Sequence, residues 1–365
     1  MGTDRLVFIR TDGNSQIASG HLVRCVSVAS ACVQRGMEVR FLVSDKESMD
    51  LLEALTKLPV ICLQTALYNH LEQELPEVCE LLSSAACGTS VPEKSVIFLL
   101  DSYYVTEDYL STISSINPTV KTVYLDDLQL FDYPVNLLVN YDVIPDTRLS
   151  AYQAAYQRAD QLLLGALYTP LREQFQNREI VVREAACDVL ITTGGSDPYH
   201  FCLELAKRLC TFSSDYSGIT FHIVIGKLNT DREALSALSE KNDFLMLHEN
   251  VSDMASLMEQ CDLAVSASGT TLYELCALGV PTISFTMADN QLTAAKAFEE
   301  ADAIPCAGDL RTDYETLIEN VMDFLKSLLV ASDVSLAKRK SAHENMHRLV
   351  DGNGALRIAD AIMKL

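Results

Sequence analysis

Short apolar segments alternate with longer amphipathic ones along most of the chain. Runs of four or five apolar residues, such as residues 6–9 and 96–100, are typical of buried strands. Between them, apolar residues recur at helical spacing, as in residues 21–35, where Gly36 marks the end of the helix. Strands that alternate with helices predict parallel sheets with helices packed on both faces.

This alternation occurs twice. The first series of strands is predicted at residues 6–9, 39–43, 60–63, 96–100, 122–125 and 135–139. The second is predicted at residues 189–192, 221–225, 244–247, 263–265, 282–285 and 303–305. Further helices are predicted at residues 46–57, 67–86 and 106–116, with a surface loop at residues 87–94.

The pattern weakens over residues 141–183, which contain two prolines and many polar residues, and this region is interpreted as a linker. Residues 313–365 are mostly helical, with a break at residues 351–354. We therefore predict two doubly wound, Rossmann-like α/β domains, with ligands at the carboxyl ends of the strands in a cleft between them. The expected boundaries are residues 1–165 and 166–345, followed by a C-terminal helix in residues 346–365 that could pack back on the first domain.

Length and composition agree with two cores and a cytoplasmic protein. The chain has 365 residues, of which 48% are hydrophobic and 21% charged. No apolar run approaches the ~20 residues of a membrane-spanning helix, and the first residues lack a signal-peptide layout, so no membrane insertion is expected. Eleven cysteines occur without a C-x-x-C pair, which favours reduced thiols over disulfides or a zinc site.

The formal net charge of −22 argues against nucleic acids and anionic membranes as partners. A small anion is still compatible with this charge, because distant carboxylates are screened beyond about 8 Å at physiological salt. Main-chain amides at a helix start act at hydrogen-bond distance, so we expect any phosphate to bind to them.

Residues 266–291 combine the features of a nucleotide site. A predicted strand runs into the small residues Ser268, Gly269 and Thr270 and then into a helix, an arrangement that presents main-chain amides to a phosphate. Glu274, one turn further, could accept hydrogen bonds from sugar hydroxyls. The next strand leads to Asn290 and Gln291 at the same sheet edge.

Polar residues also follow the first strand of each series. After the first strand, Asp12, Gly20, His21 and Arg24 surround a loop-to-helix junction, where His21 could act as a general base or simply belong to a polar turn. At the start of the second half, Gly194, Gly195, Ser196 and Asp197 precede a helix whose first turn would suit Pro198. These residues could wrap a phosphate or sugar, or Ser196 or Asp197 could cap the helix.

Carboxylates end two other strands of the first series. Asp101, followed by Tyr103, and the pair Asp126 and Asp127 could orient a water or a histidine, could hold a metal, or could be solvated or capping residues.

The segment from His343 to His347 matches the zinc-protease pattern H-E-x-x-H. No Glu or His follows His347 to supply a third ligand, so we interpret the match as fortuitous. His222 and His248 lie in or beside apolar strands and are interpreted as structural.

Taken in the order in which they occur along the chain, the loop and strand-end residues described above resemble the UDP-sugar hydrolases of pseudaminic acid synthesis. Those enzymes cleave UDP-2,4-diacetamido-2,4,6-trideoxy-β-L-altrose. Relatives of that family are labelled spore-coat polysaccharide biosynthesis proteins, and the family is similar to the GT-B glycosyltransferases. The resemblance covers both halves and rests on the segments just described, together with Arg10, Thr11, Tyr168, Arg172 and residues 351–354. It implies a GT-B fold, no metal and no cofactor.

The resemblance also implies roles. His21 would activate the water that attacks the anomeric carbon and expels UDP, and Tyr103 would lie close to the sugar. Asp12 is predicted as a third catalytic residue. The remaining positions would bind UDP or the sugar: Gly20, Arg24, Gly194, Gly195, Ser196, Asp197, Val251, Ser268, Gly269, Thr270, Glu274, Asn290 and Gln291. The alternatives are a glycosyltransferase that uses the same donor, and a binding protein for nucleotide sugars without catalysis. Oligomeric state is not predicted.

One departure concerns the loop before His21. The family's usual glycine two positions before Gly20 is Ala18 here, so a positive φ should be less accessible at this point.

Overall fold

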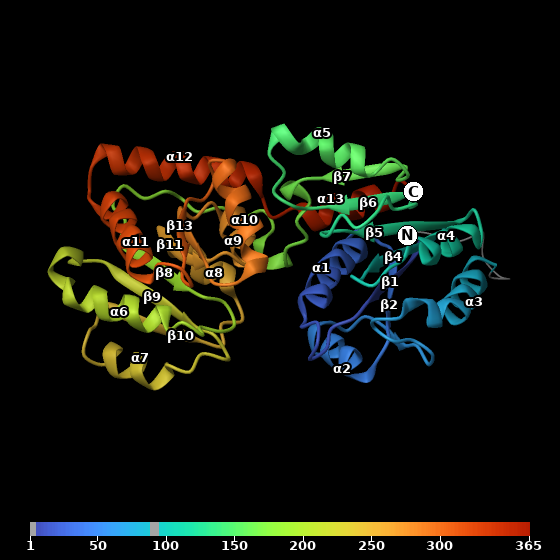
Figure 1. The fold of residues 1–365 in the computed structure, drawn as a ribbon, viewed down its shortest axis with the longest axis horizontal. Helices are drawn as coiled ribbons and strands as arrows, with labels where there is room; N and C mark the ends of the chain where they lie inside the picture. Colours follow the sequence, from blue (N-terminus) through green and yellow to red (C-terminus); the bar gives the residue numbers. More distant parts are fainter. Residues whose placement is uncertain (1–4, 88–94) are drawn as a thin grey trace. The chain divides into compact units, whose positions relative to one another are not determined.

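The computed structural model describes residues 5–87 and 95–365 of the chain (Figure 1). The chain divides into two compact units, Met1–Glu173 with Asn353–Leu365, and Gln174–Gly352. Each unit is a parallel sheet covered by helices. The surface loop expected at residues 87–94 lies almost wholly outside the described residues.

The first unit contains a seven-stranded sheet in the order β3-β2-β1-β4-β5-β6-β7, with every neighbouring pair parallel. Its strands are β1 (Arg5–Thr11), β2 (Glu38–Val43), β3 (Val60–Cys62), β4 (Ser95–Asp101), β5 (Val120–Leu125), β6 (Leu137–Asn140) and β7 (Gln161–Leu164). Its α-helices are α1 (Gly20–Gln34), α2 (Lys46–Leu55), α3 (Leu75–Ala86), α4 (Glu107–Ser115), α5 (Asp146–Ala155) and α13 (Gly354–Ile362).

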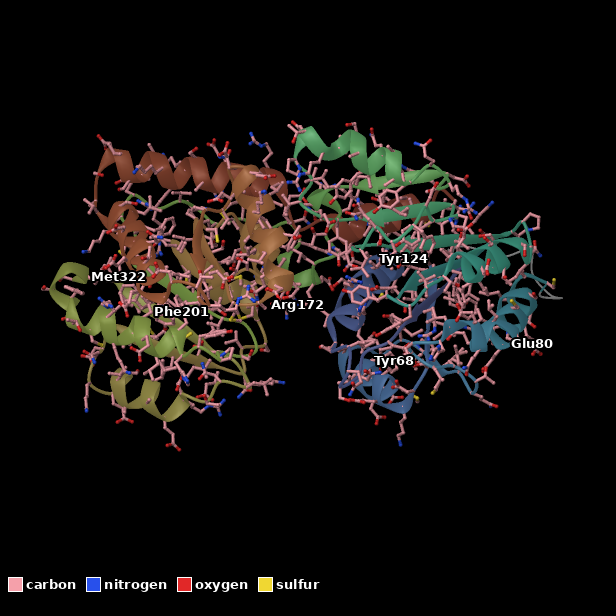
Figure 2. All side chains as sticks on the ribbon, in the orientation of Figure 1. Tyr68, Glu80, Tyr124, Arg172, Phe201 and Met322 are labelled. Atoms are coloured by element: carbon pink, nitrogen blue, oxygen red, sulfur yellow. The ribbon has the colours of Figure 1, made fainter. Side chains whose placement is uncertain are left out.

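Alternate residues of the central strands face opposite layers of helices. Val7 and Ile9 of β1 pack in one core with α1 and α13, whereas Phe8 packs in the other with α3 and α4. Tyr124 of β5 belongs to this second core (Figure 2). The last helix of the chain therefore completes the core of the first unit.

The second unit contains a six-stranded sheet in the order β10-β9-β8-β11-β12-β13, again parallel throughout. Its strands are β8 (Asp188–Thr192), β9 (Thr220–Ile225), β10 (Leu245–Glu249), β11 (Leu263–Ala267), β12 (Thr282–Thr286) and β13 (Cys306–Asp309). Its α-helices are α6 (Phe201–Thr211), α7 (Arg232–Ser239), α8 (Met254–Glu259), α9 (Thr271–Leu278), α10 (Asp289–Glu300), α11 (Tyr314–Leu329) and α12 (Asp333–Leu349). Phe201 of α6 and Met322 of α11 lie in its core (Figure 2).

Three sequence-based expectations differ from the structure. The supposed linker, residues 141–183, contains α5 and β7, and β7 is the edge strand of the first sheet. The helix expected at residues 67–86 begins only with the 3-10 turn η1 (Leu71–Glu74) and continues as α3, whose first turn holds Pro76. The strand expected at residues 303–305 starts later, as β13. Short 3-10 turns also occur at η2 (Ala166–Tyr168), η3 (Glu173–Phe175) and η4 (Ser213–Tyr216).

Among the described residues, no helix combines the length and apolar content needed to cross a bilayer.

Candidate functional site

Four neighbouring strands of the first sheet deliver polar side chains to one edge. His21 follows β1, Asp101 ends β4, Asp127 follows β5 and Tyr141 follows β6. The sheet order reverses between β1 and β4, and open α/β sheets bind ligands at such a switch point. This edge is the first candidate site.

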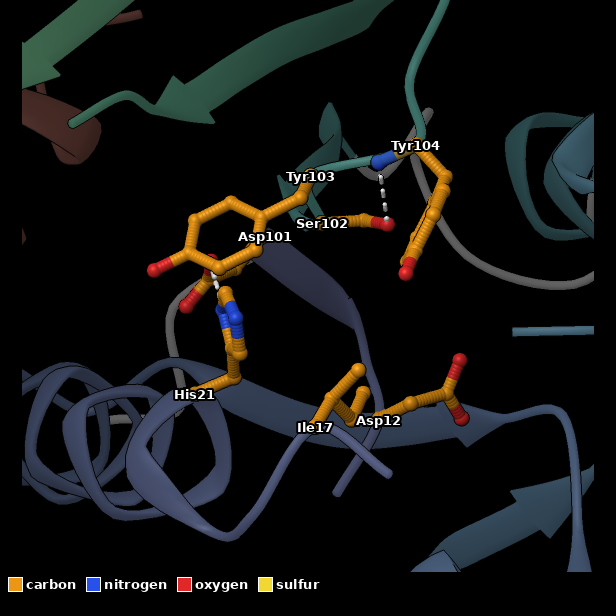
Figure 3. A pocket seen from close by; sticks show the side chains of 7 residues that line it. All are labelled: Asp12, Ile17, His21, Asp101, Ser102, Tyr103 and Tyr104. Atoms are coloured by element: carbon orange, nitrogen blue, oxygen red, sulfur yellow. Dashed lines mark hydrogen bonds and ion pairs between the residues drawn. The ribbon is translucent and has the colours of Figure 1, made fainter. Parts of the chain in front are cut away.

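His21 and Asp101 form a buried pair at this switch point. Nδ1 of His21 lies 2.7 Å from Oδ1 of Asp101, and the two side chains come from positions 80 residues apart (Figure 3). An ionised carboxylate only accepts hydrogen bonds, so Nδ1 must carry the proton that it donates to Asp101. The second ring nitrogen, Nε2, then holds the lone pair that a general base requires.

Arg24 keeps Asp101 ionised. Its Nε and Nη2 donate to Oδ2 and Oδ1 of Asp101, both at 2.5 Å, as a bidentate pair. Burial alone would raise the pKa of Asp101, but the charge of Arg24, and then His21, outweigh this and bring the pKa below its ordinary value. Arg24 Nη2 also lies 2.8 Å from Nδ1 of His21. Because Asp101 accepts from both groups, we interpret this contact as two donors side by side.

The same arginine extends the network to Tyr103. Arg24 Nη1 donates to Asp127 Oδ2 at 2.8 Å and to the hydroxyl of Tyr141. The Tyr103 hydroxyl donates to the same Asp127 oxygen at 3.1 Å, and its ring meets the His21 ring edge-on, with centroids 4.3 Å apart. Burial, reinforced by Asp127, raises the pKa of Tyr103 to about 12, so its hydroxyl remains protonated at neutral pH.

A pocket opens beside His21. Its lining consists of Asp12, Ile17, His21, Asp101, Ser102, Tyr103 and Tyr104 (Figure 3). Asp12 lines the pocket, but its carboxylate points away from the imidazole. Both of its oxygens already accept hydrogen bonds, one from Arg10 at 2.5 Å and the other from the Ser44 amide at 2.7 Å. This carboxylate ties β1 to the end of β2.

The loop between β1 and α1 adopts the conformation that we expected alanine to disfavour. Ala18 has φ +57°, in the left-handed region, and Gly20 begins α1. A left-handed alanine costs about 1–2 kcal/mol relative to its preferred conformations. The loop therefore holds its shape despite the missing glycine.

The second sheet also has a switch point, between β8 and β11, with small residues on both sides. Gly194, after β8, has φ +82°, which suits glycine. A Cβ on Gly226, after β9, would lie 2.3 Å from the carbonyl oxygen of Gly194, so this loop packs backbone against backbone. Gly195 is exposed at the same edge.

Asp197 resolves one of the alternatives left open by the sequence. Its buried carboxylate accepts hydrogen bonds from the amides of Phe201 and Cys202, at 2.8 and 2.9 Å, and so caps the start of α6. Because α6 begins at Phe201, Pro198 precedes the helix and does not occupy its first turn.

The turn into α9 lies next to this loop. The Ser268 hydroxyl donates to the Phe285 carbonyl at 2.9 Å, Gly269 is half-buried, and Thr270 is the exposed residue before the helix. Glu274 lies half-buried in the first turn of α9. The amides at this helix start and the carboxylate of Glu274 are the groups that a phosphate and a ribose would need.

The other predicted binding residues follow strands of the same sheet. Asn290 is exposed in the first turn of α10, after β12, whereas the Gln291 side chain accepts a hydrogen bond from the Met287 amide at 2.9 Å. Val251 follows the edge strand β10, two strands from β8.

The H-E-x-x-H segment packs against a helix end. Nδ1 of His343 and Nδ1 of His347 each lie 2.9 Å from a carbonyl oxygen at the C-terminal end of α9, those of Gly279 and Ala277. Within residues 5–87 and 95–365, no three His, Cys, Asp or Glu side chains are placed to hold a metal ion.

Sequence reasoning placed Asp101 and Asp127 at strand ends but did not include them among the site residues, and it assigned Tyr141 to a linker. Their common signal is position, since each lies at or just after the carboxyl end of a strand. The sequence does not predict which of the adjacent carboxylates, Asp126 or Asp127, points to the site. Asp126 is the structural one, because it accepts hydrogen bonds from the hydroxyls of Tyr133 and Tyr156.

In comparison with known proteins, a family model matches most of the second unit. Residues 189–349 match the glycosyltransferase family 28 C-terminal domain. The chain is similar to the spore coat polysaccharide biosynthesis protein SpsG of Bacillus subtilis, with 28% identity over 58% of each chain. It is also similar to the pseudaminic acid cytidylyltransferase and UDP-2,4-diacetamido-2,4,6-trideoxy-beta-L-altropyranose hydrolase of Helicobacter pylori, with 24% identity over 65% of this chain and 42% of that protein. The chain thus spans about half the length of each relative.

Among solved structures, MurG of Acinetobacter baumannii superposes with a TM-score of 0.65 at 14% identity, covering 99% of this chain and 100% of that one. The expected fold class is confirmed: the chain consists of two parallel-sheet, Rossmann-like domains and has the fold of the GT-B glycosyltransferases.

Proposed function

We propose that this chain hydrolyses a UDP-activated amino sugar to UDP and free sugar, with His21 as the general base. The observation that carries the proposal is the buried His21–Asp101 pair beside a pocket, which leaves Nε2 of His21 as the basic nitrogen. The hydrolase named among the relatives acts on a UDP-linked diacetamido sugar, and SpsG is named for polysaccharide biosynthesis. The first name supports a nucleotide-sugar substrate, and the second supports a role in polysaccharide synthesis.

In the proposed reaction, Nε2 of His21 takes a proton from water while the water oxygen attacks the anomeric carbon. The bond from that carbon to the UDP oxygen breaks, and its electron pair leaves with UDP. The configuration at the anomeric carbon is inverted. A positioned base of this kind contributes about 10²- to 10⁴-fold to the rate.

UDP is assigned to the second unit in this proposal. The amides that start α9, with Ser268, Gly269 and Thr270, would receive the diphosphate, and Glu274 would accept hydrogen bonds from the ribose. Gly194, Gly195 and Ser196 would border the phosphates, Val251 the uracil, and Asn290 and Gln291 the sugar or phosphate oxygens. Fixed amides can also stabilise the charge that develops on the departing diphosphate.

Transfer to an acceptor is the second candidate. The match of residues 189–349 to a glycosyltransferase domain favours it, because the same donor site would serve when a sugar hydroxyl replaces water. A nucleotide-sugar binding protein without turnover is the third candidate.

Incubation with a panel of UDP-sugars, including UDP-activated diamino sugars, distinguishes the three. UDP together with free sugar supports hydrolysis, UDP that appears only with an added acceptor supports transfer, and binding without UDP release supports a binding protein.

His21→Asn tests the base. It should lower turnover at least 10²-fold and leave UDP affinity within a few-fold. His70→Asn, an exposed histidine of the same unit outside the pocket, is the matched control and should leave turnover unchanged. Turnover that survives in His21→Asn would exclude His21 as the base.

A further inference from the structure

We propose that Arg24 is a positioning residue that sets the pH range in which His21 can act as a base. The proposal rests on the function proposed above and extends it, because the resemblance to known hydrolases had assigned Arg24 to the substrate.

The guanidinium of Arg24 is occupied by the protein. An arginine has five N–H donors. Nε and Nη2 each donate one to Asp101, and Nη1 donates to both Asp127 and Tyr141. The side chain is only 12% exposed. Four donors are thus engaged internally, and Nη2, which carries the fifth, lies 2.8 Å from Nδ1 of His21. The geometry therefore favours an internal role over a contact with UDP.

The position of the charge has a consequence for His21. A carboxylate beside an imidazole stabilises the protonated ring, which cannot act as a base. Here Arg24 neutralises Asp101 through two hydrogen bonds, and its Nη2 lies 2.8 Å from Nδ1 of His21. Asp101 can therefore orient the ring while the adjacent cation disfavours a second positive charge on it.

Several other ionisable groups face this pair, and their charges belong to the same balance. Asp127 and Tyr141 contact Arg24, the Cys25 thiol donates to Asp101 at 3.3 Å, and Tyr103 packs on the His21 ring. Asp12 lines the same pocket but is paired with Arg10. Arg24 is the cation in direct contact with both members of the His21–Asp101 pair.

Arg24 also holds the ring's aromatic neighbour. Asp127 accepts from Arg24 and from the hydroxyl of Tyr103 through the same oxygen. One side chain therefore fixes the tautomer-setting carboxylate and, through Asp127, the tyrosine that packs edge-on against His21.

The experiment is an ¹⁵N NMR titration of the histidine rings together with pH–rate profiles of kcat/KM. The signals of His21 are assigned by their loss in His21→Asn. In Arg24→Gln, Asp101 loses its partner, so the His21 titration midpoint should rise by about 1–2 pH units. The apparent pKa of the acidic limb of the kcat/KM profile should rise by the same amount, while KM for the UDP-sugar stays within a few-fold of the wild-type value. Arg35→Gln removes the same charge from the residue that follows α1, where it pairs with Asp360, and should leave both readouts unchanged.

Asp127→Asn should shift the His21 midpoint in the opposite direction, and it provides the test if Arg24→Gln does not fold. Removing this carboxylate leaves the cation less compensated, so the His21 midpoint should fall by about half a pH unit. A midpoint that stays at the wild-type value in either variant, or that rises in Asp127→Asn, would overturn the proposal. A tenfold rise in KM in Arg24→Gln, with the acidic limb of kcat/KM at its wild-type pH, would instead show that Arg24 binds the substrate. The ring titration needs no turnover. If the wild-type chain releases no UDP but the two variants show these shifts, hydrolysis is refuted and the effect of Arg24 on His21 still stands.

Discussion

The two sheet edges use different chemistry. At the edge of the first sheet, polar side chains that end or follow four strands are joined through Arg24 into one network around His21 and Asp101. At the edge of the second sheet, the groups are glycines, hydroxyls and the amides of a helix start, and Asp197 is used to cap α6. The first arrangement can move a proton, and the second can receive an anion without a basic side chain.

This contrast explains how a strongly acidic chain would bind the phosphorylated ligand proposed above. Main-chain amides carry no net charge, so they bind a phosphate at hydrogen-bond distance and are indifferent to the carboxylates elsewhere on the surface. Changing one side chain or one backbone contact at each edge tests this difference.

The largest expected effect is on the first edge. Asp101→Asn should lower kcat about 10²- to 10³-fold with UDP affinity within a few-fold, because the amide can donate to Nδ1 and stabilise the wrong tautomer of His21. Steady-state kinetics and UDP titration measure the two quantities. Asp108→Asn, an exposed carboxylate in the first turn of α4, is the control. An Asp101→Asn enzyme with wild-type kcat would show that the carboxylate is not needed to orient the ring.

The second edge should be sensitive to backbone contacts. Gly226→Ala would place a methyl group 2.3 Å from the Gly194 carbonyl oxygen and should displace the loop. We expect a loss of about 1–3 kcal/mol in stability and weaker UDP binding, measured by denaturant unfolding and by titration. Gly195→Ala has open space around its Cβ and should keep wild-type stability. Equal stability of the two variants would contradict the packing described.

Glu274→Ala should weaken UDP binding by about 1–3 kcal/mol through lost hydrogen bonds to ribose, with kcat at saturating substrate nearly unchanged. Glu233→Ala, in the first turn of α7, provides the control. Calorimetric titration with UDP is the measurement. Unchanged affinity in Glu274→Ala would remove this residue from the site.

The smallest expected effect concerns the cost of burying the Asp142 carboxylate near other acids at the first edge. Burial, with a contribution from Asp127, raises the pKa of Asp142 to about 6. A carboxyl group whose pKa is raised on folding lowers stability above that pKa and has no such effect below its unfolded pKa of about 4. Asp142→Asn should therefore stabilise the chain by about 1–2 kcal/mol at pH 7.5 and by nearly nothing at pH 4.

Denaturant unfolding of Asp142→Asn at the two pH values checks this prediction. The amide can still accept the hydrogen bond from Tyr152 that the carboxylate accepts at 3.1 Å. A stabilisation of equal size at both pH values would mean that charge is not its origin.

The sequence allowed the buried strands to be placed well, and the exposed elements poorly. Strands such as β4 are apolar along their whole middle, here residues 96–100, because both faces are covered, so their pattern stands out. Helix α5 has no buried residue and therefore no apolar stripe, and β7 is an edge strand. Both were hidden in the supposed linker for that reason.

The candidate site was predictable as a set of strand ends but not as a network. His21 and Asp101 could be placed near one edge from the strand order that the helices imply. That Arg24 turns inward to Asp101, 77 positions away, depends on side-chain geometry that no local pattern contains. Asp126 and Asp127 are adjacent and identical in type, yet one anchors tyrosines and the other reaches Arg24.

The position of α13 has a consequence for synthesis. Its residues Ala355, Ile358 and Ile362 fill the core between α1 and the first sheet, although they are translated after the whole of the second unit. The first unit thus begins to leave the ribosome before the second and is completed after it, whereas residues 174–352 are contiguous. Until α13 has been translated, the nascent first sheet lacks the helix that covers part of its apolar face, and this is the interval in which a chaperone would be of most use to this chain.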